Sequence, residues 1–368
     1  MAGMNIEQVL KALRTVKDPW LNRDIVALDF VRDLDADNNA VRFKLILNRP
    51  SPSAQALLEQ AARDAILSLG GSPPVEIETG WEVTAGKSAE GKQSVPGVKN
   101  IIAVSSGKGG VGKSTVAVNL AVALAQAGAQ VGLLDTDVYG PNVPIMVGVN
   151  EQPRVHGQML LPNTAHGIKV MSLGFLNPGD RPVVWRGPML HTAVRQFLYD
   201  VEWGELDYLI VDMPPGTGDA QLSLAQLVPV QGAVVVTTPQ EVAMADVRKA
   251  INMFEQVHIP VLGVVENMSY FVCENCSTRH AIFGTGGGAE LAGRFNVSLL
   301  GQVPLSVAVR EGGDAGVPIV VGAPDSLQAA AFREIAEHVA TQISLQAIKG
   351  AGLPVINLSD NRGDRFAV

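Results

Sequence analysis

The sequence predicts an α/β protein built on a mainly parallel sheet with helices on both faces, preceded by a small α/β domain. Two observations predict this class: the alternation of strand and helix patterns, and a glycine-rich turn between the first strand and the next helix. The turn spans residues 107–115, and the residues after it, up to 127, are rich in alanine and leucine. The apolar runs that predict strands lie at 100–105, 130–134, 207–211, 232–237 and 261–265.

A small domain is predicted over residues 1–83. Helical apolar spacing is found at 6–16 and 53–69, and strand-like alternation at 41–47 and 75–83. Two helices and two strands of this length are typical of a compact α/β unit.

The rest of the chain is predicted to form a linker, a large domain and a tail. Residues 84–98 are small, polar and glycine-containing, which is typical of a flexible linker. The large domain is expected over 99–345, and its last helix pattern lies at 325–345. Residues 346–368 hold glycines, a proline and scattered charges, so an extended tail is expected there.

The composition of the 368 residues argues against several classes of protein. Apolar residues make up 47% and charged residues 17%, so a chain with full cores is expected rather than a disordered one. The formal net charge of −8 argues against a general nucleic-acid-binding protein. We expect a cytoplasmic protein without a membrane partner, because no apolar run could span a bilayer and the N-terminus lacks a secretory pattern.

Residues 107–115 read Gly-Lys-Gly-Gly-Val-Gly-Lys-Ser-Thr, which has the spacing of a P-loop. Glycines let backbone N–H groups converge on phosphate oxygens, and the following helix adds the positive end of its dipole. Lys113 is predicted to neutralise the β and γ phosphates and Ser114 to ligate Mg²⁺. A glycine turn that binds nothing is the weaker interpretation, because a strand precedes the motif and a helix follows it. The expected nucleotide site comprises Gly107, Lys108, Gly109, Gly110, Val111, Gly112, Lys113, Ser114 and Thr115.

Acidic residues follow two of the predicted strands. Asp135 and Asp137 come after the second run, and Asp212 follows the run at 207–211. Ligands collect beyond the carboxyl ends of strands in open α/β sheets, so these carboxylates are expected at the nucleotide. They could hold Mg²⁺ through water or orient a water molecule for attack on a γ-phosphate. The alternative is that such acids cap the next helix or turn, and it is weakest for Asp212.

The chain has only two cysteines, Cys273 and Cys276, which excludes a disulfide framework. Two thiolates three positions apart can bind one metal ion or cluster, but zinc or a four-iron cluster usually takes four ligands. A symmetric dimer would bring two such pairs together. Three interpretations stay open: an iron–sulfur cluster that bridges a dimer, a bridging zinc, and a redox disulfide or no function. His280 lies close by, but a nearby histidine is more often a surface residue.

The P-loop with its additional lysine, Lys108, resembles that of the MinD/ParA class of ATPases, which includes the nitrogenase iron protein. The resemblance implies ATP and Mg²⁺ as ligands and a homodimer in which Lys108 reaches the partner's nucleotide. It makes Asp137 the water-orienting residue, so Lys108, Lys113 and Asp137 are the expected catalytic residues. Asp135 and Asp212 are the acids expected at the metal. Asn267 matches an adenine-recognising asparagine, and slow, switch-type ATP hydrolysis is implied.

Longer motifs resemble the Mrp/ApbC family of iron–sulfur cluster carrier ATPases. The match runs from about 98 to 345, and its motifs lie at 137–142, 212–219, 266–276, 283–288 and 310–314. The resemblance implies a labile cluster at Cys273 and Cys276, with 4Fe–4S favoured, bridging a homodimer. It also implies apo iron–sulfur proteins as recipients and cluster scaffold or donor proteins as partners.

The N-terminal domain departs from its own resemblance in one respect. Residues 16–21 and 24–26 resemble the small domain of SufT-like assembly proteins, whose stand-alone members often carry a cysteine after the central strand. Residues 48–53 hold no cysteine at that place, so a docking role is expected rather than a cluster ligand, and a purely structural role is the alternative. Two alternative functions remain for the whole chain: a MinD/ParA-like positioning ATPase, and an ATP-dependent reductase like the nitrogenase iron protein.

Overall fold

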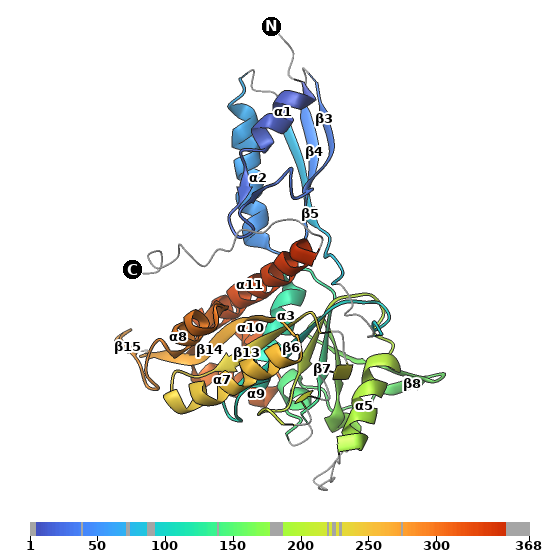
Figure 1. Ribbon diagram of the computed structural model, residues 1–368, viewed down its shortest axis with the longest axis vertical. Coiled ribbons are helices and arrows are strands. Elements are labelled where there is room, and N and C mark those ends of the chain that lie inside the picture. The colour runs from blue at the N-terminus through green and yellow to red at the C-terminus, as the bar shows by residue number, and fades with distance from the viewer. Residues whose placement is uncertain are drawn as a thin grey trace. The chain divides into compact units, whose positions relative to one another are not determined.

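A computed structural model describes residues 5–37, 40–70, 74–86, 93–137, 140–176, 187–218, 221–222, 226–227, 230–273 and 275–350 (Figure 1). The chain forms two compact units. One contains the described residues up to Thr84 together with those from Ala340 onward, and the other contains Ala85–Val339. None of the described helices is both long and apolar enough to cross a membrane.

The larger unit is built on a sheet that is parallel apart from its short outer strands. The central strands are β7 (Val131–Asp135), β12 (Leu206–Asp212), β6 (Val98–Ser106), β13 (Gly232–Thr237) and β14 (Val261–Val272). On the β7 side the sheet continues through β11 (Ile168–Ser172) to the antiparallel β10 (Asn163–Ala165). On the other side β14 pairs with the antiparallel β15 (Arg279–His280) and the parallel β16 (Ser298–Leu305).

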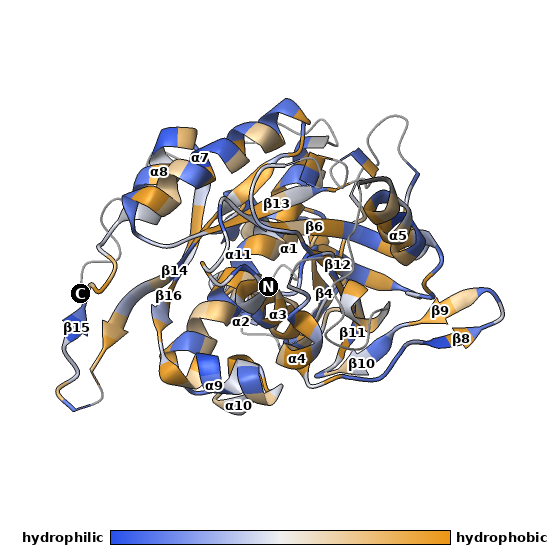
Figure 2. Ribbon diagram, turned by 90° about the horizontal axis from the view of Figure 1, so that it is seen from below, coloured by the Kyte–Doolittle hydropathy of each residue, from blue (hydrophilic) through white to orange (hydrophobic). Residues whose placement is uncertain are grey.

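Helices cover both faces of this sheet, as Figure 2 shows. Helix α3 (Lys113–Gln126) contacts β6, β7 and β12 and is joined by α4 (Val143–Val147) and α10 (Ile319–Gly322). The opposite face carries α7 (Glu241–Gln256) and α8 (Gly287–Phe295), which contact β13 and β14. The described residues of this unit also form α5 (Gly187–Tyr199), α9 (Val307–Ala315), the first part of α11 (Leu327–Gly350) and a 3-10 helix at Leu173–Leu176. A short hairpin is formed by β8 (Arg154–His156) and β9 (Met159–Leu161).

Residue type explains why these segments fold as they do. Strand β6 is buried from Asn100 to Ser106, and its Ile-Ile-Ala-Val run suits a strand covered on both faces. Helix α3 is buried along most of its length, because alanine, valine and leucine surround it on every side. The loop between β6 and α3 is thereby fixed at both ends by buried elements.

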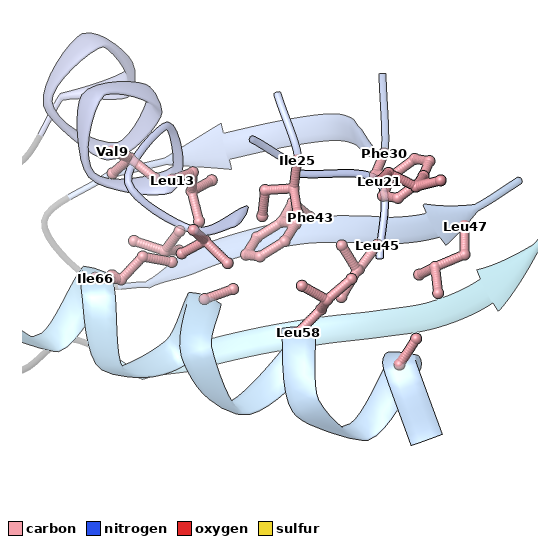
Figure 3. Close-up of a cluster of buried hydrophobic side chains, with 14 residues drawn as sticks. Val9, Leu13, Leu21, Ile25, Phe30, Phe43, Leu45, Leu47, Leu58 and Ile66 are labelled. Atoms are coloured by element: carbon pink, nitrogen blue, oxygen red, sulfur yellow. The ribbon is translucent and has the colours of Figure 1, made fainter. Parts of the chain in front are cut away.

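The smaller unit has a sheet of β3 (Val31–Ala36), β4 (Val41–Leu47) and β5 (Val75–Trp81), with β4 in the middle. Helices α1 (Ile6–Leu13) and α2 (Pro52–Leu67) contribute the apolar side chains that meet this sheet in Figure 3. Two short paired strands, β1 (Lys17–Asp18) and β2 (Arg23–Asp24), complete it. Alternate residues of β4 are buried, as the alternating sequence pattern predicts.

The C-terminal helix corrects one expectation about the tail. Helix α11 continues to Gly350, so the extended tail expected from 346 is wrong for residues 346–350. Leu345 and Ile348 pack against the hydrophobic core of the smaller unit, which is why the helix does not stop earlier. The rest of the expected tail, 351–368, lies outside the described residues.

Part of the expected linker is also described. Residues 87–92 lie outside the described residues, but Val95 is buried and the Gly86 N–H donates to the Lys99 carbonyl at 3.0 Å. These flanking residues are therefore packed against the larger unit, at the start of β6.

Candidate functional site

The glycine-rich segment forms the loop between β6 and α3, at the carboxyl edge of the sheet. Gly110 and Gly112 have φ angles of 80° and 84°, a left-handed conformation that favours glycine. A Cβ on Gly107 would lie 2.3 Å from the Asp246 backbone, so this position has no room for a side chain. Gly112 is the N-cap of α3 and supplies no side-chain cap, which leaves the first N–H groups of the helix available to an anion.

Lys113 lies at the start of α3 among the acids from the neighbouring strands. Its side chain is only 6% exposed, and its Nζ donates to Asp212 Oδ1 at 2.6 Å and to Ser114 Oγ at 3.3 Å. The same Nζ is 3.6 Å from Asp137 Oδ2. The structure therefore brings together a cation from the glycine loop and carboxylates from β12 and from the end of β7.

Asp135 and Asp212 are opposite each other on the adjacent parallel strands β7 and β12, and both are fully buried. Burial, reinforced by the negative charge of Asp212, raises the pKa of Asp135 to about 8. Burial also raises the pKa of Asp212, and the neighbouring Lys113 ammonium opposes that shift. Two buried carboxylates this close cannot both be charged without a strong cationic partner.

The residues present fit a hard divalent cation. Asp212 Oδ2 is buried and has no hydrogen-bond partner among the described residues. Carboxylate and hydroxyl oxygens, as on Asp135, Asp212 and Ser114, are the donor types that Mg²⁺ prefers. Asp137 is oriented next to them, because its N–H donates to Asp135 Oδ1 at 3.0 Å.

Asn267 lies on β14 and contacts the glycine loop directly. Its Nδ2 donates to the Val111 carbonyl at 2.9 Å, and the side chain is buried. A Cβ on Gly112 would meet the same Nδ2 at 2.1 Å, which is a second reason for glycine there. The expected adenine-recognising residue is thus next to the P-loop, at the edge where a nucleotide would bind. Lys108, Gly109 and Thr115 complete the loop, and Lys108 is partly exposed.

The two cysteines lie in the turn between β14 and β15. These two strands meet at an outer edge of the sheet (Figure 2). Both are free; Cys273 is half-buried and Cys276 is exposed. The Cys273 N–H donates to the Thr278 carbonyl at 3.0 Å, and the Ser277 N–H donates to the Cys273 carbonyl at 2.8 Å. These bonds and the left-handed Ser277, with φ at 56°, give the turn a defined shape.

The thiol of Cys276 has a hydrogen-bonding neighbour. Its Sγ–H donates to Thr278 Oγ1 at 3.2 Å, and hydrogen bonding with Thr278 lowers the pKa of the Cys276 thiol. Beyond the turn, Arg279 stacks on the Tyr270 ring at 4.1 Å, and its Nη2 lies 3.2 Å from the Tyr270 hydroxyl. His280 is exposed and faces Phe271 at 6.5 Å between ring centroids. Within the described residues, no group of three or more His, Cys, Asp or Glu side chains is placed to hold a metal ion.

Three residues of the site were missed from the sequence. The Ser172 hydroxyl donates to Asp135 Oδ2 at 2.8 Å, and Glu266 accepts from the Gly288 N–H at 2.5 Å and from Gln302 Nε2 at 2.7 Å. Ser172 and Glu266 each follow an apolar run, so the expectation that polar residues after strands line the site, which found Asp212, could have found these two as well. Thr278 has no such signal, because only the turn geometry brings it to the sulfur.

The region after β4 in the smaller unit contains a buried ion pair. Arg49 Nη2 donates to Asp18 Oδ2 at 2.7 Å, and both side chains are fully buried. Asp18 also accepts the N–H groups of Trp20 and Leu21. The segment after β4, where the resemblance implies a cysteine, thus contributes Arg49 to a buried structural ion pair.

The fold and the loop between β6 and α3 define a P-loop NTPase. The chain belongs to the family described as NUBPL iron-transfer P-loop NTPase, whose model matches residues 97–340. A second family model, described as iron–sulfur cluster assembly protein, matches residues 6–79. The family and the fold class expected from the motifs are confirmed.

Relatives extend along nearly the whole chain. The iron–sulfur cluster carrier protein of Synechocystis is 51% identical over 94% of this chain and 99% of its own. The protein of the same name from Deinococcus radiodurans is 48% identical over 93% of this chain and 97% of its own. The protein of that name from Escherichia coli is 44% identical over 92% of both chains.

Two solved structures resemble the larger unit. The nucleotide-binding protein from Archaeoglobus fulgidus in complex with ADP is 44% identical, with a TM-score of 0.55 over 60% of this chain and 88% of that one. The cell division ATPase MinD of Pyrococcus furiosus is 25% identical, with a TM-score of 0.50 over 65% of this chain and 98% of that one.

Proposed function

We propose that this protein is a cytoplasmic ATPase that binds a labile iron–sulfur cluster between two copies of the chain and transfers it to apoproteins. The observation that carries the proposal is the pair of free cysteines in the turn that follows β14, where Cys276 is exposed and Cys273 is half-buried. Asn267, on that same strand, contacts the P-loop. Relatives that align with more than nine-tenths of the chain are named iron–sulfur cluster carrier proteins, which supports the same function.

ATP is the substrate that the loop and its acids suit. Lys113 would exchange its bond to Asp212 for the β and γ phosphate oxygens, where its charge is most useful. Asp135, Asp212 and Ser114 would hold Mg²⁺, which supplies neutralisation of the phosphate charge. Asp137, 3.6 Å from the Lys113 Nζ, would orient the water that attacks the γ-phosphate. Asn267 would select adenine from the edge of the loop.

A dimer completes both parts of the site. One chain offers two thiols, whereas a 4Fe–4S cluster takes four, and a twofold axis would supply the second pair. Lys108, partly exposed in the loop, would reach the nucleotide of the partner copy. Hydrolysis would then remove a charge that both copies bind, and slow, switch-like turnover follows from that role.

The alternatives explain fewer residues. A positioning ATPase shares the fold of the Pyrococcus furiosus protein, but it leaves the cysteine turn without a use. A firmly held redox cluster, as a reductase needs, suits a turn that is less exposed than the one containing Cys276. We assign the smaller unit to docking of recipient or donor proteins, because its Arg49–Asp18 pair takes the place of a cluster ligand.

Anaerobic reconstitution with iron and sulfide tests the proposal. Wild-type protein is expected to bind one cluster per two chains, and Cys273→Ala is expected to lose it while retaining ATP hydrolysis. Asn275→Ala, at the exposed residue between the cysteines, is the matched control and is expected to retain the cluster. Lys113→Ala is expected to lose ATP hydrolysis. Full iron binding by Cys273→Ala would show that the cysteine turn is not the cargo site.

A further inference from the structure

We propose that Thr278 is a positioning residue that sets how firmly the chain retains its cluster. Thr278 Oγ1 lies 3.2 Å from the Cys276 sulfur, and residues 275–278 of the turn are exposed. The proposal goes beyond the two ligands themselves, and it rests on the proposed function of Cys273 and Cys276.

The backbone of the turn fixes where the threonine hydroxyl lies. The Thr278 carbonyl accepts the Cys273 N–H, and the Ser277 N–H donates to the Cys273 carbonyl, so the two ends of the turn are joined by two bonds. Strand pairing then continues outward through Arg279 opposite Val272. The hydroxyl is therefore held beside Cys276 by the main chain, and its position does not depend on a long side chain.

The hydroxyl becomes more important when both cysteines are ligands. In the free turn, the Cys276 thiol donates to Thr278 Oγ1 at 3.2 Å. Metal binding removes the thiol proton, so Cys276 can no longer donate to Thr278 and the bond has to reverse its direction. Thr278 keeps its O–H and can donate to the bound sulfur, which orients it and stabilises the metal-bound form.

The strength of the Thr278–Cys276 hydrogen bond suits a protein that has to release its cluster. Removing an outer-shell hydrogen bond to a metal ligand typically costs tenfold to a hundredfold in metal affinity. Because Cys276 and Thr278 are both exposed, we expect the low end of that range, a change of about tenfold. One solvent-exposed bond of this kind retains a cluster without making it permanent.

The test is the rate at which reconstituted protein loses iron to a chelator. Thr278→Val keeps the shape of the side chain and removes only the hydroxyl, and about tenfold faster loss is expected. Thr278→Ser restores the hydroxyl and is expected to restore the wild-type rate. Arg279→Gln is the matched control, because it loosens the contact with Tyr270 without touching the sulfur, and its rate is expected to stay near wild type.

Two further readouts keep the outcomes distinct. Unchanged ATP hydrolysis in Thr278→Val shows that the variant is folded, and a shift in the visible sulfur-to-iron absorption shows that the ligand itself is perturbed. A Thr278→Val rate equal to wild type, or equal acceleration in Arg279→Gln, overturns the role of Thr278. Failure of wild-type protein to bind any cluster would instead overturn the proposed function.

Discussion

Replacing Lys113 by methionine tests the electrostatics of the nucleotide site most sharply. Lys113 donates to Asp212 at 2.6 Å and lies 3.6 Å from Asp137, and its side chain is 6% exposed. Methionine keeps most of the volume but leaves buried carboxylates without their cation. Breaking a buried pair in this way typically costs about 3 to 5 kcal/mol.

The loss of stability is expected to depend on pH in a defined direction. Burial already raises the pKa of Asp212, and removing Lys113 removes the charge that opposes this shift. The variant can therefore relieve the cost by protonating Asp212, so the destabilisation is largest at high pH and shrinks as the pH falls. Asp212→Asn in the same chain removes the orphaned charge, so the double variant is expected to be more stable than Lys113→Met alone.

Hydrogen–deuterium exchange of the β12 amides, without nucleotide or magnesium, is the appropriate assay. These amides report the stability of the larger unit alone, so unfolding of the smaller unit does not contribute to the measurement. A loss of 3 kcal/mol corresponds to exchange that is roughly a hundredfold faster in Lys113→Met. Equal exchange in wild type and variant, or no rescue by Asp212→Asn, would refute the idea that Lys113 compensates these acids.

Three further predictions address other parts of the chain. Without ligands, the free energy of unfolding of the wild-type protein, measured by urea titration, is expected to fall as the pH rises from about 4 to about 8. The reason is that the folded state keeps a proton on Asp135 that the unfolded chain releases. Asp135→Asn should flatten that slope, and an unaltered slope contradicts the assignment. Ser277→Gly should relieve the left-handed φ of 56° and slow amide exchange in the cysteine turn, whereas faster exchange would show that the turn is unstrained. Arg49→Met should destabilise the smaller unit by about 3 to 5 kcal/mol, because it leaves the buried Asp18 carboxylate without its cation, and unchanged exchange of the β4 amides would contradict this.

The nucleotide half of the site could be predicted because its signals are local. A P-loop is contiguous in sequence, and Asp135 and Asp212 each end an apolar run. The parallel sheet then brings these strand ends to one edge, where the structure places both acids in register. How Lys113 is shared between Asp212 and Asp137 depends on side-chain directions, which spacing does not encode.

Features that depend on long-range packing could not be predicted. The pattern for α11 fades after 345, yet Leu345 and Ile348 continue the helix because they pack on a core formed by residues near the other end of the chain. Thr278 contacts Cys276 in a turn where Ser277 takes a left-handed conformation, and a serine in the sequence does not predict that conformation. Sequence rules find ligands more readily than the residues that orient them.

Native mass spectrometry of anaerobically reconstituted protein tests the central claim most directly. A mass of two chains with a single cluster is the predicted result, and the cluster should vanish from the Cys273→Ala protein. Isolated chains that each carry a complete cluster, or two-chain species whose iron content is unaffected by removing the Cys273 sulfur, would contradict a cargo site shared between two copies.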